Sequence, residues 1–304
     1  MGLQPPLHQP VMLKEVLDWL RPGPGKVIAD CTLGTGGHAM SILREIGPSG
    51  LLIGIDRDSE VIEVARGFLS QAGNPFRLFH SNYGGLGQIL QETEIGGSTV
   101  GARGLDGLLL DLGVSSYQLG RPERGFSFQC EGPLDMRMDR TSGPTAGELL
   151  RRLKEEELAR LFWEYGEERW SRRIARAIKT YLRKEPLETT TQLASLIERA
   201  VPRGKRRIHP ATKVFQALRI AVNRELGGLE AFLSTVYQYL RPGARMVAIS
   251  FHSLEDRIVK HSFLAGFKGG VYRLLTKKPV RPSQEEVREN PRSRSAKLRA
   301  VERI

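Results

Sequence analysis

The first 112 residues of the chain alternate strand and helix patterns, and this order constrains the fold more than any other feature of the sequence. Four segments have strand patterns: the buried-strand run 26–31, the run 51–56, the short strand 76–80, and 105–113, which is apolar almost throughout. Three segments with helical periodicity separate them: 36–46, 59–71 and 86–93. Strands that alternate with helices in this way form parallel βαβ units with right-handed crossovers. The order therefore predicts a doubly wound α/β sheet.

The alternation stops after the fourth strand. Residues 117–212 contain no convincing strand; they begin with a loop rich in Gly, Pro and Arg and continue as three helical patterns. The α/β pattern then returns as two helices and three strand candidates: helices 211–225 and 229–240, strands 244–250, 271–275 and 297–304. We therefore expect an α/β domain made of residues 1–116 and 213–304 that carries an all-helical insertion, residues 117–212. A loop at the end of a strand accepts such an insertion without interrupting the sheet.

Composition narrows the class of protein. The chain is 40% hydrophobic and 26% charged, which is typical of a soluble globular protein. Its N-terminus has no basic segment followed by an apolar one, and no stretch reaches the roughly 18 apolar residues of a membrane span. The two cysteines, Cys31 and Cys130, have no metal-ligand spacing. We expect a cytoplasmic protein in a reducing compartment, with no membrane contact, no metal and two buried thiols.

The net charge of +12 is concentrated in two segments. Residues 151–213 hold 17 Lys and Arg against 9 Asp and Glu, a net charge of +8. Residues 268–304 hold 11 against 4, a net charge of +7, so the remainder of the chain carries 12 − 15 = −3. This distribution favours a polyanionic partner that contacts the two segments, with a solvated basic face as the alternative.

The segment DCTLGTGGHAM, residues 30–40, follows the first predicted strand, at the edge of the sheet where α/β proteins bind ligands. It lacks the lysine of a P-loop and the last glycine of the dinucleotide fingerprint, although alanine is tolerated there. Asp30 would repel a phosphate but suits a ligand with an ammonium group. Asp56, which lies 56 − 36 = 20 residues after Gly36, suits two ribose hydroxyls. The turn favours S-adenosylmethionine (SAM), with a dinucleotide or a purely structural turn as alternatives.

Several long motifs then occur in order along almost the whole chain: HQPVMLKEVL (8–17), DCTLGTGGH (30–38), DLGVSSYQL (111–119), PLDMRMD (133–139), KVFQALRIAVNRELGGLE (213–230), ISFHSLEDRIVK (249–260) and NPRSRSAKLRAVERI (290–304). With these motifs the chain closely resembles the bacterial 16S ribosomal RNA cytosine-N4 methyltransferases, the MraW family. The resemblance implies a class I (Rossmann-like) SAM-dependent methyltransferase sheet with a helical, RNA-recognising insertion. It also implies SAM as methyl donor. The implied acceptor is N4 of a decoding-centre cytidine, near the P site, in the 16S rRNA of the small ribosomal subunit.

Two other functions stay open at this stage. A methyltransferase of the same fold could act on DNA cytosine or on a small molecule. DNA amino-methyltransferases usually carry D/N/S-P-P-Y/F at the fourth strand, where this chain has DLGVSS, and a small-molecule enzyme would not need two basic segments. The second alternative is a catalytically silent RNA-binding protein that uses SAM structurally, against which the intact Gly-rich turn and acids argue. The sequence leaves open whether the protein forms a homodimer.

The resemblance implies a set of cofactor contacts in the first turn and after the following strands: Gly36, Gly37, His38, Asp56, Tyr83, Asp111 and Gln118. To these the chemistry of the first turn adds Asp30 and Gly34. In this interpretation Asp56 binds the ribose, and Tyr83, which follows the third strand, lies beside the adenine.

An exocyclic cytosine amine is a poor nucleophile because its lone pair is delocalised into the ring. Its methylation needs an acceptor for the N4 hydrogens and in-line placement of the reacting atoms, rather than a covalent intermediate. We assign this work to Asp111 and the loop that holds Ser115 and Ser116. For Asp111 a role in cofactor binding alone is the alternative. His252 could contact the target base or a phosphate, or could belong to a helix-capping segment with Ser253 as the N-cap.

Clustered basic residues are the predicted RNA contacts: Arg169, Arg172, Arg173, Arg176, Arg203, Lys205, Arg206, Arg207, Arg292, Arg294 and Lys297. We expect the first four to lie close together on one helix. Phe126, Phe128 and Asn223 are candidates for contact with a splayed base, and are equally consistent with core positions.

Overall fold

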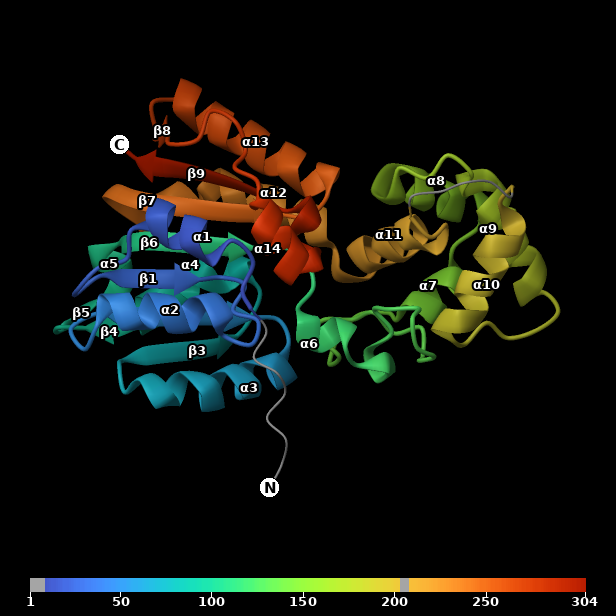
Figure 1. Cartoon of the computed structure of the whole chain (residues 1–304), viewed down its shortest axis with the longest axis horizontal. Helices are drawn as coiled ribbons and strands as arrows, with labels where there is room; N and C mark the ends of the chain where they lie inside the picture. The colour runs from blue at the N-terminus through green and yellow to red at the C-terminus, as the bar shows by residue number, and fades with distance from the viewer. Residues whose placement is uncertain (1–8, 203–207) are drawn as a thin grey trace. The chain divides into compact units, whose positions relative to one another are not determined.

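The protein folds into two compact units in the computed structural model, which describes residues 9–202 and 208–304. The α/β unit consists of Met1–Gly113 and Leu226–Ile304, and the helical unit consists of Val114–Glu225. Figure 1 shows the chain coloured from the N-terminus to the C-terminus with both units labelled by element. Each unit has its own buried apolar core.

A seven-stranded sheet forms the centre of the α/β unit, with strand order β3-β2-β1-β6-β7-β9-β8 (Figure 1). The strands are β1 (Val27–Asp30), β2 (Leu51–Asp56), β3 (Phe76–His80), β6 (Leu105–Asp111), β7 (Leu240–Ser250), β8 (Tyr272–Leu274) and β9 (Lys297–Arg303). The first five strands in this order are parallel, and β9 pairs antiparallel with both β7 and β8. The predicted doubly wound sheet is confirmed.

Helices cover both faces of the sheet. On one face lie α1 (Leu13–Leu20), α2 (Gly37–Ile46) and α3 (Ser59–Leu69). On the other face lie α4 (Leu86–Glu92), α5 (Val100–Arg103), α12 (Glu225–Thr235) and α13 (Ser253–Lys268). Successive strand residues point to opposite faces, so in β6 Leu108 and Leu110 join one core and Leu109 joins the other. Burial on both sides explains why the central strands β1, β2 and β6 are apolar almost throughout.

The strand boundaries follow the sequence patterns with local exceptions. β2 and β3 have the predicted bounds, whereas β7 begins at Leu240, which the helix 229–240 was expected to include. The N-cap of α3 is Asp58, one residue before the predicted helix 59–71: the Asp58 carboxylate accepts a hydrogen bond of 3.1 Å from the Glu60 amide. The elements that were not predicted include the hairpin β4 (Glu94–Ile95) and β5 (Ser98–Thr99), and α14 (Gln284–Glu289).

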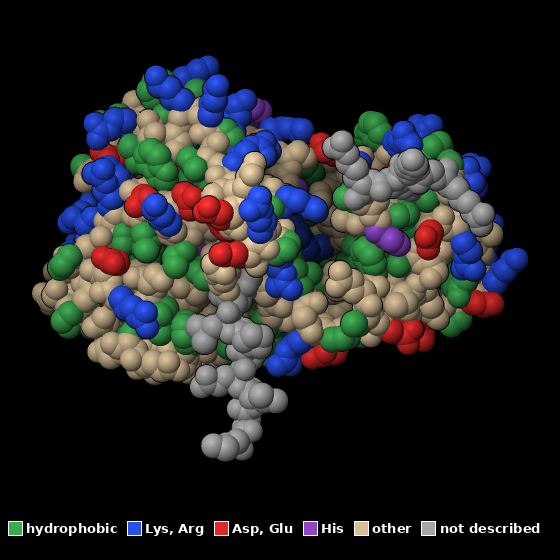
Figure 2. All heavy atoms as spheres, in the orientation of Figure 1, with side chains coloured by type: hydrophobic (Ala, Val, Ile, Leu, Met, Phe, Trp, Pro, Cys, Tyr) green, Lys and Arg blue, Asp and Glu red, His purple; other side chains and the backbone are tan. Residues whose placement is uncertain are grey.

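The helical unit contains α6 (Ser116–Leu119), α7 (Ala146–Arg152), α8 (Glu155–Gly166), α9 (Ser171–Leu182), α10 (Thr190–Ala200) and α11 (Ala211–Asn223). Its described residues, 114–202 and 208–225, form no strand longer than the isolated bridge between Pro133 and Thr189. In Figure 2 Lys and Arg side chains are exposed on this unit over α8 and α9.

The helical unit ends later than the expected insertion. α11 was expected in the α/β domain, but its apolar face, which includes Val214 and Leu218, is buried in the core of the helical unit. α11 packs closely on α8, because a Cβ atom at Gly166 would lie 2.6 Å from the carbonyl oxygen of Lys213. Glycine at this position lets the two backbones approach.

The helices and the two cysteines bear on what was expected from composition. None of the described helices is long and apolar enough to cross a membrane. Cys31 is buried at the end of β1, as expected, but Cys130 is exposed, so the expectation of two buried thiols is wrong for Cys130. It lies in the Gly-rich loop of the helical unit, where its backbone carbonyl accepts a hydrogen bond from the Thr190 hydroxyl.

Candidate active site

The three acids singled out in the sequence end neighbouring parallel strands of the α/β unit. Asp30 is the last residue of β1, Asp56 of β2 and Asp111 of β6. The strand order reverses between β1 and β6, since the chain continues from β1 towards β3 on one side and from β6 towards β7 on the other. Ligands of open α/β sheets bind at the carboxyl ends of the strands beside such a switch point.

The turn after β1 is shaped by glycines and tied to β2. Gly34 and Gly36 adopt φ angles of 53° and 89°, a region that favours glycine. Gly36 is the N-cap of α2, so Gly37 and His38 form the first turn of that helix. The Gly34 amide donates a hydrogen bond of 2.9 Å to Asp56 Oδ2. The turn therefore presents backbone groups and the Asp56 carboxylate together.

Asp30 is a buried carboxyl without a cationic partner among the described residues. The Thr32 amide donates to Asp30 Oδ1 over 3.1 Å, and the Thr32 hydroxyl accepts a hydrogen bond of 2.5 Å from the Asp111 amide. Burial, and to a smaller degree the charge of Asp56, raises the pKa of Asp30 to about 7. Burial likewise raises the pKa of Asp56 to about 6. A positively charged ligand would stabilise the ionised form of both acids.

The Asp111 side chain has one oxygen in contact with a histidine and one without a partner. Asp111 Oδ2 lies 3.5 Å from His38 Nδ1. Asp111 Oδ1 is buried, and no described residue donates a hydrogen bond to it. Burial raises the pKa of Asp111 well above its ordinary value, and the charges of Asp30 and Glu255 act in the same direction. An unpaired buried acceptor at a ligand-binding edge indicates a ligand with an N–H or O–H donor.

The orientation of His38 determines what it can offer to Asp111. Its Nε2 lies 2.8 Å from the carbonyl oxygen of Val11, which can only accept, so Nε2 carries a hydrogen. Nδ1, which faces Asp111, is then either protonated as part of an imidazolium or holds a lone pair. A favourable contact between Nδ1 and the carboxyl needs one proton between them, on His38 or on Asp111.

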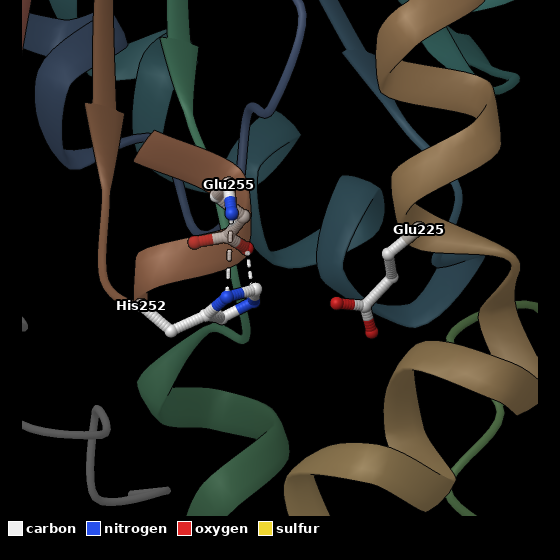
Figure 3. Close-up of side chains that lie close together, drawn as sticks. All are labelled: Glu225, His252 and Glu255. Carbon is white, nitrogen blue, oxygen red and sulfur yellow. Dashed lines mark hydrogen bonds and ion pairs between the residues drawn. The ribbon is translucent and has the colours of Figure 1, made fainter. Parts of the chain in front are cut away.

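His252 is the N-cap of α13, and Figure 3 shows how Glu255 holds its ring. The Glu255 amide donates to His252 Nδ1 over 3.4 Å, and His252 Nε2 lies 3.1 Å from Glu255 Oε1. Glu255 Oε2 accepts a hydrogen bond of 2.9 Å from the Phe251 amide. The cap is therefore His252 and not Ser253 as expected. Glu255 was expected only as an acid in the first turn of this helix, and its contact with His252 was not predicted, although the spacing His252-x-x-Glu255 is that of a capping box.

The remaining site residues divide between the two units. Tyr83 opens the short helix η2 (Tyr83–Gly85) after β3 in the α/β unit, where its ring lies 5.1 Å from that of Phe232. Ser115, Ser116 and Gln118 belong to the helical unit. Ser115 is the N-cap of α6 and forms a capping box with the buried Gln118. The hydroxyl of Ser115 is thus used in local structure.

The predicted RNA contacts of the helical unit differ in their exposure and in whether another side chain contacts the guanidinium. Arg169 precedes α9 rather than lying on it, and its guanidinium lies 5.2 Å from the Trp170 ring. Arg172 and Arg173 are exposed on α9, whereas Arg176 forms a 3.3 Å ion pair with Glu155. Four more candidates lie outside the described residues: Arg203, Lys205, Arg206 and Arg207.

In the C-terminal segment Arg292 and Arg294 are exposed on the short helix η5 (Pro291–Ser295). Lys297, on β9, instead forms a 3.0 Å ion pair with Asp256 of α13, so its charge is largely compensated. Lys297 and Asp256 lie 41 residues apart in the sequence. The local sequence around Lys297 therefore could not predict this ion pair.

The candidate base contacts of the helical unit are used in its core. Phe126 is buried, and Phe128 packs on Phe215 with ring centroids 4.9 Å apart. The Asn223 amide group donates to the Met136 carbonyl and accepts from the Met138 amide, each over 2.8 Å. The contacts of these three residues are those expected for core positions.

A doubly wound sheet with this strand order, acids at the ends of β1, β2 and β6, and a glycine turn without a phosphate-binding lysine define a class I SAM-dependent methyltransferase. The buried acid Asp30 and the unpaired Asp111 oxygen fit a ligand that brings an ammonium group and hydrogen-bond donors. The model of the MraW methylase family matches residues 6–304, and the chain belongs to this family. The resemblance seen in the sequence is confirmed.

Full-length relatives agree with this assignment. The chain is 51% identical to "Ribosomal RNA small subunit methyltransferase H" of Geobacter sulfurreducens, over 98% of this chain and 99% of the relative. It is 50% identical to the protein of the same name from Syntrophotalea carbinolica, over 98% of each chain. The similarity therefore includes both the α/β unit and the helical unit.

Proposed function

We propose that this protein transfers a methyl group from SAM to N4 of a decoding-centre cytidine, near the P site, in the 16S rRNA of the small ribosomal subunit. The reaction would take place in the bacterial cytoplasm. Relatives that match both chains almost entirely carry the name of a small-subunit rRNA methyltransferase, which supports rRNA as the substrate class. The observation that supports amine methylation most directly is the buried and unpaired Asp111 Oδ1 at the end of β6.

The residues at the strand ends would hold the cofactor. Asp30 would face the ammonium group, Asp56 the ribose hydroxyls and Tyr83 the adenine, while the turn at Gly36 and Gly37 allows close approach to the backbone. When bound, SAM supplies a methyl group on a positively charged sulfur. The protein has to bring the amine of cytosine in line with that group and exclude water from the reacting atoms.

Asp111 would orient the amine. A carboxylate oxygen that accepts an N4 hydrogen turns the lone pair of the amine out of conjugation with the ring and towards the methyl group. Orientation of this kind lowers a barrier by up to roughly 7–11 kcal/mol. The proton that N4 loses after methyl transfer would leave to a side chain or to solvent. The alternative role for Asp111 is cofactor binding alone. His252 and the loop of Ser115 and Ser116 would assist Asp111 in placing the amine.

The helical unit would recognise the RNA. It carries 23 Lys and Arg against 15 Asp and Glu, a net charge of +8, and its arginines Arg172 and Arg173 are exposed. Exposed cations of this density suit the phosphates of an RNA backbone. A cytidine whose N4 is to be methylated must be unpaired or splayed, since N4 takes part in base pairing.

The proposal is tested by incubating small ribosomal subunits from an unmethylated source with labelled SAM and analysing the nucleosides. We expect N4-methylcytidine in the 16S rRNA. A methyl group on ring carbon 5, or label in DNA but not in rRNA, would contradict the proposal. No label at all, from protein that binds SAM in a separate assay, would favour the silent RNA-binding protein instead.

A further inference from the structure

The helical unit holds a cleft of about 590 Å³ that the predicted RNA contacts do not include. We call it the α7–α9 cleft. Four basic side chains line it: Arg151 at the end of α7, Lys154 before α8, and Lys179 and Arg183 on and after α9. Leu182 and Pro186 add apolar surface. All of these residues belong to the helical unit and lie within the part of the chain that the structure describes.

One of the four positive charges, that of Lys179, is fixed in place by backbone contacts. Lys179 Nζ donates to the carbonyl oxygens of Leu150 and Arg151 at the end of α7, over 3.1 and 3.0 Å, so its ammonium is fixed in place. Partial burial and then the charge of Arg183 lower the pKa of Lys179. Cations that repel each other in this way are stabilised when an anion enters between them.

Carboxylates do not remove this charge. Glu155 also lines the cleft, but it forms an ion pair with Arg176 outside it. Glu156 is then the remaining acid of the lining. Within residues 9–202 and 208–304, no carboxylate forms an ion pair with Arg151, Lys154 or Arg183. The lining holds four basic and two acidic side chains, so the cleft carries a net formal charge of +2.

The size and lining of the cleft indicate the class of ligand. A volume of about 590 Å³ is far larger than a single phosphate ion and falls in the range of sites for nucleotide-sized ligands. Basic groups from the ends of three helices, together with the apolar side chains of Leu182 and Pro186, match a ribose–phosphate backbone with a base or sugar laid against the apolar side chains. The basic residues around Arg172, by contrast, lie on an open helix surface.

We propose that the α7–α9 cleft is a binding site for a single-stranded segment of the rRNA substrate, whose phosphates contact Arg151, Lys154 and Arg183. The proposal deepens the proposed function, because it rests on rRNA as the substrate. It assigns the backbone contacts of the helical unit to a concave site in addition to the exposed surface of α9.

The test compares two pairs of charge reversals in the full-length protein. R151E/R183E changes two lining residues. R152E/K184E is the matched control, because Arg152 and Lys184 are their exposed sequence neighbours and do not line the cleft. Binding of a short fluorescein-labelled single-stranded RNA is measured over a series of KCl concentrations. We expect R151E/R183E to weaken binding about tenfold at low salt and to reduce the slope of log K against log [salt] by roughly 1.4.

The control pair should weaken binding much less than R151E/R183E. Equal losses for the two pairs would overturn the proposal, since they would show a general effect of net charge. Unchanged RNA affinity with weakened binding to small subunits would also overturn it and would indicate a ribosomal protein as the partner. If charge reversal lowers the melting temperature, the neutral pair R151Q/R183Q is compared with R152Q/K184Q. Methylation of small subunits by the unchanged protein tests the proposed function separately.

Discussion

In the α/β unit the charges at the site are buried or half-buried carboxylates at the ends of three parallel strands, whereas in the helical unit they are exposed arginines and lysines. Asp30 and Asp111 lack a full set of partners within the described residues. Without its last 37 residues, 268–304, the α/β unit has a net charge of −3, while the helical unit has +8. Buried acids suit selection of a small cationic ligand, and exposed cations suit the capture of a long anionic one. Substitutions in the two units should therefore change different measurements.

The largest effect on the ligand site is expected from Gly36→Val. Gly36 has a φ of 89°, a conformation that a β-branched residue adopts only with strain, and an added Cβ would already be in van der Waals contact with Ala65, Phe68 and Leu69 at 3.5 Å, which leaves little room for the two γ-methyl groups of Val. A strain of about 3 kcal/mol corresponds to roughly a 10²-fold loss of SAM affinity, measured by calorimetry. Gly47→Val is the matched control, because Gly47 also has a positive φ but follows the other end of α2. Equal losses of SAM affinity in the two variants would contradict a direct role of the first turn.

On the side of the helical unit, R172E/R173E should act on RNA alone. We expect about a tenfold weaker RNA affinity and a salt slope lower by roughly 1.4, with SAM affinity unchanged. R44E/R66E makes the same change of formal charge on exposed residues of α2 and α3. A similar loss of RNA affinity in this control would mean that the net charge of the whole chain, rather than the helical unit, attracts the RNA.

His38→Gln should change the pH dependence of the single-turnover rate of methyl transfer. The amide of Gln can still donate to the Val11 carbonyl but supplies no proton to Asp111. Asp111 should then be protonated more readily, because burial and neighbouring acids already raise its pKa. The acidic limb of the single-turnover rate profile should move to higher pH, with a loss of several-fold near neutrality. An unchanged profile would rule out a proton shared by His38 and Asp111.

The last effect concerns stability rather than binding or rate. Burial raises the pKa of Asp30 from 3.8 to about 7, so the folded protein holds this proton more tightly than the unfolded chain does. Stability of the SAM-free protein should therefore fall as pH rises from about 4 to 7, and Asp56 acts in the same direction. Asp30→Asn should be more stable than the unchanged protein at pH 8, by on the order of 2 kcal/mol in urea unfolding. The difference should vanish towards pH 4; a difference of the same size at both pH values would contradict this cause.

The sequence was sufficient for much of the fold because the relevant signals are local. β2 and β3 have the predicted bounds, since apolar runs there are flanked by residues that end strands. The placement of α11 could not be predicted, because its helical pattern is the same in either unit and packing against α8 decides the matter. Leu240 was assigned to a helix, but pairing with Leu105 makes it the first residue of β7.

The site shows the same division between local and long-range information. Glycines, acids and their positions after strands predicted that Asp30, Asp56 and Asp111 end neighbouring strands of the α/β unit, as the structure shows. The pairing of Lys297 with Asp256 and the contacts of Asn223 with the segment at Met136 join distant parts of the chain and had no local signal. The unpaired state of Asp111 Oδ1 depends on every neighbour of that atom, so only the structure could reveal it.

The division between the two units is tested most directly by single-turnover methyl transfer at saturating SAM and saturating small subunits, with Asp111→Asn and R172E/R173E measured side by side. We expect Asp111→Asn to lower the rate constant by about 10²-fold or more while it still binds small subunits normally. R172E/R173E should keep the rate constant and need a higher concentration of small subunits to reach it. An Asp111→Asn protein that loses SAM affinity but reacts at the normal rate once saturated would contradict the catalytic role given to Asp111.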